Sequence, residues 1–189
     1  MPNSLPPSGA LMALDIAQVK TALDDLFSQR QPPPSWEEQR ETVIRLGQPD
    51  LFTSLIETIL SDQALLHKVA SRSYIHENKF DKIVLMSSSN PDYKLRLHVW
   101  WPSPEAPHTE TIHNHQWTLS SIVLVGALHW QEFIPANAGS ELLHYTYKTR
   151  PGLRNLPKLA MGPVALDAFP TSSRPRAPIT AFLQMYYTA

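Results

Sequence analysis

The chain has 189 residues, 42% of them hydrophobic and 17% charged, a balance typical of one folded domain of ordinary size. Sixteen basic and seventeen acidic residues give a net charge of -1 without any block of like charge, so nucleic acid and anionic membranes are poor candidate partners. The absence of cysteine excludes disulfides, thiolate metal sites and a cysteine nucleophile. Any metal site must therefore use His, Asp or Glu side chains.

The N-terminal third is predicted to be helical after a disordered lead over residues 1–9. Apolar residues recur at helical spacing over residues 10–30, and a second helix over 36–46 follows Ser35, which has the capping-box spacing to Glu38. Asp50 is predicted to cap a third helix, which carries an apolar stripe as far as Val69. The helical segment is therefore expected to span residues 10–72.

From residue 73 onward the hydrophobic pattern changes towards the two-residue alternation of strands. The predicted strands cover residues 83–86, 93–101, 111–117, 119–133, 142–147 and 179–187. Because no helical stripe interrupts them, an antiparallel barrel or sandwich of the jelly-roll kind is expected. The predicted fold is therefore mainly β, a jelly-roll barrel over residues 73–189 preceded by the helical segment.

The most informative motif is His113-Asn114-His115. Side chains two apart on a strand project from the same face, so the two imidazoles could bind one metal ion. A hydrophobic strand over residues 120–125 follows and ends at Gly126, where a tight hairpin is predicted to return the chain as residues 127–133. A polar pair beside a buried strand is the simplest alternative, without any metal.

The motif resembles the first conserved motif of the cupin superfamily, Gly-x5-His-x-His-x3,4-Glu-x6-Gly. His113, His115 and Gly126 match it, whereas Pro107 occupies the first Gly position, and Leu119, or Ser120 in the longer form of the motif, occupies the Glu position. The loss of the Glu resembles the thiol dioxygenase branch, in which three His hold iron(II). The layout around the pair is similar to that of the cysteamine and plant cysteine oxidases.

The resemblance implies an iron(II)-dependent oxygenase, with another divalent metal as the alternative, that acts on a small metabolite and O2. A thiol or an amino-acid-like compound is the implied substrate. The second motif of the family would supply a third His, but no His follows His144 in this chain. His144 is therefore the candidate third metal ligand, and the other donors considered are His98, His129, Glu141 and Asp167.

Two further residues are candidates for catalytic roles. Arg96 would share a strand face with His98 and Trp100, and its guanidinium could bind a substrate carboxylate, although an exposed Arg on a barrel strand is the commoner case. Tyr145 could donate a hydrogen bond to bound oxygen or substrate, with cross-strand packing as the alternative.

Two other readings of function stay open. The Pro, Ser and Arg-rich stretch over residues 170–176 stands where the second motif is expected, which favours a catalytically incomplete cupin-fold binding or structural protein. A non-redox isomerase or lyase that uses the metal as a Lewis acid is the other alternative. No apolar run is long enough to cross a membrane and no secretory signal is present, so a cytoplasmic protein is expected, with homodimerisation through an edge strand as a candidate assembly.

Overall fold

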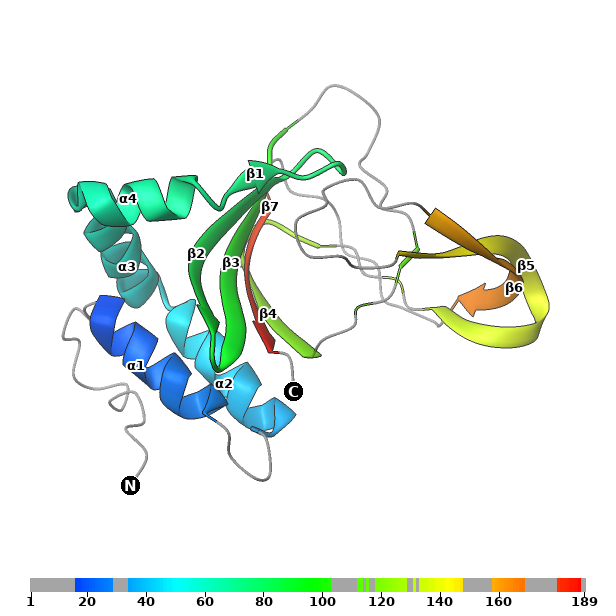
Figure 1. Ribbon diagram of the computed structural model, residues 1–189, viewed down its shortest axis with the longest axis horizontal. Coiled ribbons are helices and arrows are strands. Elements are labelled where there is room, and N and C mark those ends of the chain that lie inside the picture. Colours follow the sequence, from blue (N-terminus) through cyan, green and yellow to red (C-terminus); the bar gives the residue numbers. More distant parts are fainter. Residues whose placement is uncertain are drawn as a thin grey trace. The chain divides into compact units, whose positions relative to one another are not determined.

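A computed structural model describes residues 16–28, 34–102, 112–113, 115, 118–128, 131, 133–147, 158–168 and 180–187. The chain divides into two compact units, one formed by residues 1–128 with 176–189 and the other by residues 129–175. Among the described residues, the first unit contains four helices and a sheet, and the second contains a two-stranded ribbon (Figure 1).

The helices lie where the sequence places them. They are α1 (Ile16–Phe27), α2 (Trp36–Leu46), α3 (Pro49–Ser61) and α4 (Gln63–Ala70). The predicted capping box of α2 is present, because Glu38 N donates to Ser35 Oγ at 3.2 Å and Ser35 N donates to Glu38 Oε2 at 2.8 Å. Two of the backbone donors at the start of this helix are thereby satisfied.

The third predicted helix is two helices, which corrects the expectation from the apolar stripe. Asp50 lies in the first turn of α3 and does not cap it; Gln48 precedes the helix and Pro49 opens it. Asp62 has an extended backbone, and its carboxylate accepts hydrogen bonds from Ala64 N at 2.8 Å and Leu65 N at 3.1 Å. The stripe continues through this break because α3 and α4 both contribute side chains to the same core.

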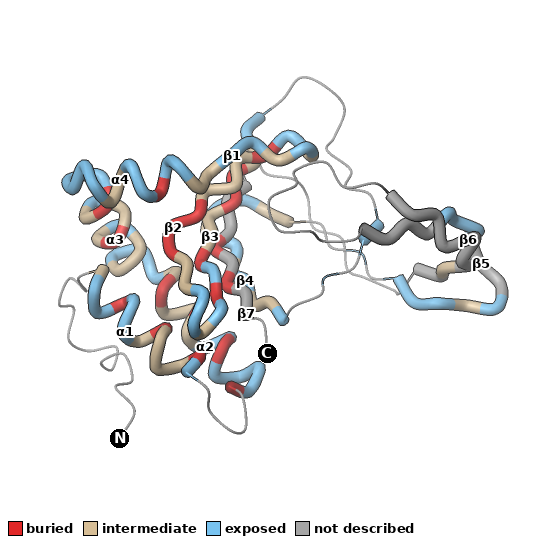
Figure 2. Tube along the Cα trace, viewed as in Figure 1, coloured by how far each residue is buried: buried red, intermediate tan, exposed pale blue. Residues whose placement is uncertain are grey.

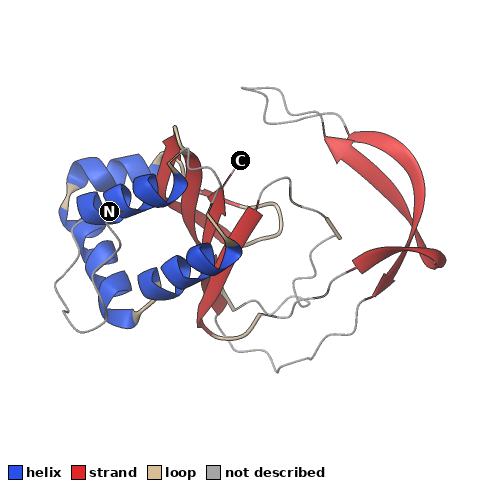
Figure 3. Ribbon diagram, turned by 90° about the horizontal axis from the view of Figure 1, so that it is seen from below, coloured by secondary structure: helices blue, strands red, loops and turns tan. Residues whose placement is uncertain are grey.

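Five antiparallel strands form the sheet of the first unit in the order β1-β2-β3-β7-β4. They are β1 (Tyr74–Ile75), β2 (Asp81–Ser89), β3 (Asp92–Trp100), β4 (Thr118–Val125) and β7 (Thr180–Tyr187). Strands were expected within or close to each of β2, β3, β4 and β7. Figure 3 shows the helices together on one side of this sheet.

The hydrophobic core lies between the helices and the sheet, where Figure 2 shows the buried positions. Residues that are at most 1% exposed come from both layers, and they include Val19, Leu23 and Phe27 from α1, Val43 and Leu46 from α2, and Tyr93, Leu95, Leu183 and Met185 from the sheet. The end of α2 approaches β4 so closely that a Cβ at Gly47 would lie 2.8 Å from Ile122 Cγ2. Any side chain at this position would require the Ile122 side chain to shift.

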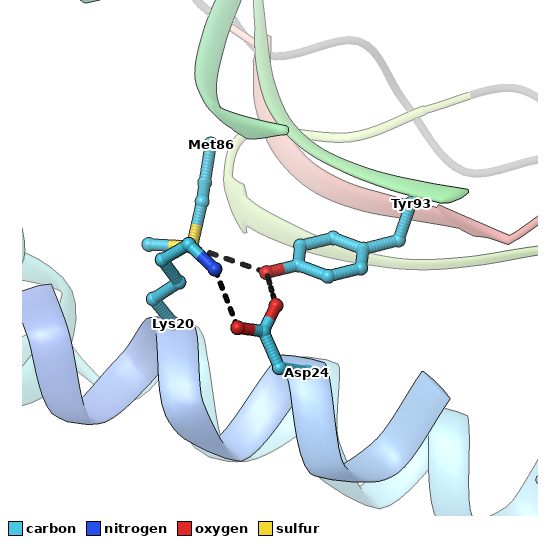
Figure 4. A network of polar contacts seen from close by, with 4 residues as sticks. All are labelled: Lys20, Asp24, Met86 and Tyr93. Atoms are coloured by element: carbon cyan, nitrogen blue, oxygen red, sulfur yellow. Dashed lines mark hydrogen bonds and ion pairs between the residues drawn. The ribbon is translucent and has the colours of Figure 1, made fainter. Parts of the chain in front are cut away.

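A polar contact within this core joins α1 to β3 (Figure 4). The Tyr93 hydroxyl donates a hydrogen bond of 2.7 Å to Asp24 Oδ1, and the same carboxylate forms an ion pair with Lys20. The Tyr93 ring stacks on Phe27 at 5.4 Å between centroids. Burial raises the pKa of Tyr93 above its ordinary value, and the hydrogen bond to Asp24 and its negative charge raise it further.

The second unit contains β5 (Phe133–Tyr147) and β6 (Lys158–Ala168), which pair antiparallel. β6 was not predicted, because its sequence contains Gly162 and Pro163, which are unfavourable in strands. The hairpin expected to return the chain after Gly126 is not found in the described residues. Gly126 has a positive φ of 86°, but β4 pairs with β7, and Phe133 pairs with Ala168.

The predicted N-terminal helices and antiparallel strands are present, but the prediction of a mainly β barrel needs correction. The described strands form an open five-stranded sheet and a separate ribbon, with four helices covering one face of the sheet. The fold is therefore mixed helix and sheet. Helix α4 ends at Ala70 and β1 begins at Tyr74, on either side of the boundary expected after residue 72.

Candidate functional site

The sheet face turned away from the helices carries most of the polar side chains that could form a site. Along β3, Tyr93 and Leu95 belong to the helix-covered core, so the alternate residues Arg96 and His98 face the other way. Lys82 lies directly opposite His98 in the register of β2 and β3, and therefore lies on the same face as His98. By the same alternation Lys94 lies on this face, so three cationic side chains and one imidazole share it.

Aromatic rings surround His98, whose exposed fraction is only 4%. Its ring centroid lies 4.9 Å from that of Phe80 and 5.9 Å from that of Trp100, and Phe80 and Trp100 stack at 4.3 Å. His76 stacks on the other rings through Phe80 at 4.5 Å. We call Tyr74, His76, Phe80, His98 and Trp100 the ring cluster.

Burial lowers the pKa of His98 to about 3, and the positive charges of Lys82 and Arg96 are the next largest causes. His76 and His115 lower the pKa of His98 further. The imidazole of His98 is therefore neutral at neutral pH, the form in which histidine binds metals.

His113 and His115 are exposed and lie just before β4. Their ring centroids are 4.9 Å apart and the ring planes are nearly perpendicular, at 84°. Neither residue is in a strand, which corrects the expectation of a strand over residues 111–117, whose other members lie largely outside the described residues. The physical reason is that β4 begins at Thr118 opposite Tyr187, the last residue of β7, so its partner strand does not extend to the pair.

The separation of the two rings is compatible with a shared metal ion. Imidazoles that bind one ion through nitrogens at about 2.1 Å place their centroids roughly 4.5–5.5 Å apart. His113 and His115 satisfy this spacing. However, no group of three or more His, Asp or Glu side chains that could hold a metal is found among the described residues. The pair fits as two ligands of a metal site, and the described part of the chain does not complete it.

The register of the sheet places the start of β4, which follows the pair, at the opposite end of the sheet from Trp100. Tyr93 at the start of β3 and Thr118 at the start of β4 both pair with Tyr187, so β3 and β4 run parallel on the two sides of β7. The chain leaves β3 at Trp100 and must re-enter at the opposite end of the sheet.

The remaining predicted residues lie in different places. Arg96 is half-buried on β3, opposite Val84 of β2, on the same face as His98 as expected. His144 and Tyr145 lie on β5 in the second unit, opposite Gly162 and Ala160, and only their backbone positions are described. Glu141 and Asp167 are also in that ribbon, and His129 lies outside the described residues.

Lys82 and Phe80 were not identified from the sequence as members of a site. Lys82 Nζ lies 5.4 Å from the centroid of the Tyr74 ring and 5.6 Å from that of Phe80, within cation–π range of both. The signal that could have found them is the two-residue spacing of Phe80 and Lys82. His113 and His115 have the same spacing, and so do Arg96 and His98.

Comparisons with protein-family models, curated proteins and solved structures found no match. In the part of the chain that the structure describes, no helix has the length and hydrophobicity needed to span a membrane.

Proposed function

We propose that the protein is a metal-dependent oxygenase of the cupin type, with iron(II) bound by His113 and His115, that acts on a small metabolite and O2. The single observation that supports this most directly is the 4.9 Å separation of the two imidazole centroids beside the start of β4. The proposal includes a jelly-roll arrangement of the strands. Another divalent metal at the same pair is the nearest variant of this proposal.

Bound iron(II) would allow dioxygen to react with an organic substrate, and this reaction is slow without a metal. The residues of this chain have the supporting tasks. His113 and His115 contribute imidazole nitrogens, and the ring cluster is proposed to provide an apolar wall that keeps water from the site. Tyr145 is proposed to donate a hydrogen bond to bound oxygen or substrate.

The third metal ligand is proposed to be His144, since mononuclear iron sites commonly use three protein ligands on one face. It is the last His of the chain and lies on a described strand, β5. A thiol or an amino-acid-like compound is the proposed substrate, on the basis of the resemblance to thiol dioxygenases.

A second candidate is a catalytically incomplete cupin-fold binding protein. It is favoured by one observation: the described residues include no group of three or more side chains that could hold a metal. A non-redox isomerase or lyase differs from the oxygenase in needing neither iron specifically nor O2. The two metal-dependent classes are thus separated by metal identity and oxygen consumption.

The test is elemental analysis of protein purified without a His tag, before and after reconstitution with iron(II), followed by oxygen uptake with small thiols. Variants His113→Ala, His115→Ala and His144→Ala are compared with His67→Ala, whose exposed imidazole is on α4 and serves as the matched control. We expect near-stoichiometric iron that is lost in the first two variants and in His144→Ala, and retained in the control.

Each other outcome selects a different reading. Retention of iron in His144→Ala would overturn that assignment while leaving the pair in place. Absence of bound transition metal after reconstitution would contradict the oxygenase and favour the binding protein. Stoichiometric metal without oxygen uptake for any thiol or amino acid, together with equal enzymatic activity of the iron-loaded and zinc-loaded proteins, would favour the isomerase or lyase.

A further inference from the structure

We propose that Lys82, Arg96 and the ring cluster form a binding subsite for a small organic carboxylate with an aromatic or other apolar body. The subsite lies on the sheet face turned away from the helices. As the substrate class of an enzyme, this inference rests on the proposed function; as a binding site, it rests on the geometry of β1, β2, β3 and the turn between β1 and β2.

The two cations lie on different sides of His98. Lys82 is its direct cross-strand neighbour, and Arg96 is two residues away on the same strand and the same face. Both side chains are half-buried, so their charges are less screened than those of fully exposed residues. After burial, the positive charges of Lys82 and Arg96 are the largest causes of the lowered pKa of His98. The electrostatic potential around this imidazole is therefore positive. A negative ligand is therefore favoured at this face.

The ring cluster explains why the ligand should carry an apolar body. Phe80 and Trp100 stack at 4.3 Å, and His98 lies against both. Because Phe80 and His98 are each only 4% exposed, the aromatic surface open to a ligand is that of Tyr74, His76 and Trp100. Lys82 Nζ lies over the rings of Tyr74 and Phe80, so the charge is held directly beside this surface. A ligand could place a ring or alkyl group on the aromatic surface while its carboxylate reaches the ammonium and the guanidinium.

The same features favour a carboxylate over inorganic phosphate. Phosphate sites commonly use Gly-rich loops that present several backbone N–H groups, and this chain has only six glycines and no such loop motif. The planar guanidinium of Arg96 matches a carboxylate with two parallel hydrogen bonds. Asp81, the acidic neighbour of Lys82 in the sequence, accepts a hydrogen bond of 2.7 Å from Trp101 Nε1. Its carboxylate therefore has a partner at Trp101.

The experiment is a ligand-observed NMR titration of the metal-free, full-length protein with benzoate, benzamide and inorganic phosphate. The variants are Arg96→Gln and Lys82→Gln, with Lys94→Gln as the matched control. Lys94 undergoes the same loss of charge on the same strand, but it is exposed and lies opposite Ser87, two residues beyond Arg96. We expect saturable benzoate binding that is about tenfold weaker in Arg96→Gln and in Lys82→Gln, and nearly unchanged in Lys94→Gln.

The two other ligands test the two parts of the subsite. Benzamide lacks the charge and should bind about tenfold more weakly than benzoate, and phosphate lacks the apolar body and should also bind more weakly. Circular dichroism checks that each variant folds. If Arg96→Gln does not fold, Arg96→Lys keeps the charge but lacks the planar fork, and it should still weaken benzoate binding.

The proposal is overturned if benzoate does not bind, if benzamide or phosphate binds as tightly, or if Lys94→Gln weakens binding as much as the two test variants. Its failure is distinguishable from failure of the proposed function because no metal is added. Metal bound at His113 and His115 without benzoate binding would remove the subsite alone. Benzoate binding that depends on Arg96 in a protein that takes up no metal would remove only the oxygenase.

Discussion

The two faces of the five-stranded sheet differ in composition although the same strands form both. Towards the helices, Leu95, Leu183 and Met185 are completely buried in an apolar core. On the opposite face, Lys82 and Arg96 flank a buried imidazole, and valines of β4 remain substantially exposed. The two-residue alternation of a strand thus lets one face stabilise the fold while the other presents chemistry. Substitutions on the two faces should therefore have separable effects.

The largest expected effect is on the helix-covered face. Leu95→Ala should lower the free energy of unfolding by about 2–5 kcal/mol, because it removes a fully buried side chain and leaves a cavity. Urea denaturation followed by circular dichroism measures the change. In the folded variant, affinity for benzoate should stay close to that of the wild type. A loss below about 1 kcal/mol would mean that this face is not the main core.

The next effect is a pH dependence that belongs to the opposite face. The pKa of His98 is about 3 in the folded protein and about 6.5 when unfolded, so only the unfolded state takes up this proton between those values. The stabilisation is complete above pH 6.5 and falls as the pH is lowered towards 3. By pH 5 the loss should be about 2 kcal/mol.

Chemical denaturation between pH 7.5 and pH 5, in wild type and His98→Leu, measures this loss. The variant cannot bind this proton. The slope of its free energy of unfolding against pH should therefore be smaller than that of the wild type, by an amount equivalent to the uptake of nearly one proton. Equal slopes of the unfolding free energy against pH for the two proteins would show that His98 takes up a proton in the folded state. This result would contradict the burial of His98 within the ring cluster.

A smaller effect is expected at the contact between α1 and β3. Tyr93→Phe should cost about 1 kcal/mol, because it removes the hydrogen bond to Asp24 but keeps the buried ring on Phe27. A double-mutant cycle with Asp24→Ala should give a coupling energy of about the same size. Additive effects of the two substitutions would contradict the hydrogen bond.

The raised pKa of Tyr93 also predicts that this contribution is lost as the pH rises above about 10, where the unfolded tyrosine ionises.

The smallest effect should come from β4 on the polar face. Val123 is 41% exposed, so Val123→Ala should change the free energy of unfolding by only about 0.5 kcal/mol. The neighbouring Ile122→Ala, which removes a side chain packed against the core, provides the internal comparison and should cost more. A cost at Val123 equal to that at Ile122 would remove the distinction between the two faces.

The elements that the sequence predicted well are those with local signals. The Ser35 and Glu38 capping box gave the start of α2, and the alternation around Leu95 gave β3. The break at Asp62 was missed because the apolar stripe passes through it without interruption. The open form of the sheet could not be predicted, because it depends on which strands pair, and β7 lies between β3 and β4 although it is last in the sequence.

The candidate site was predictable only in part for a similar reason. His113 and His115 were identified by their spacing, and Arg96 by sharing a face with His98. Lys82 and Phe80 come from another strand, and only the register of β2 with β3 brings them beside His98. The expectation that the His pair lies on a strand was wrong because local alternation says nothing about where a partner strand ends.

The most direct test of the central claim, that His113 and His115 hold a metal ion, is NMR of the protein with one equivalent of cobalt(II). We predict paramagnetic shifts that are centred on the two histidines and extend to His98, are small for α1, and disappear in His115→Ala. Shifts centred on another histidine, such as the exposed His67 on α4, or the absence of any shift, would contradict the claim.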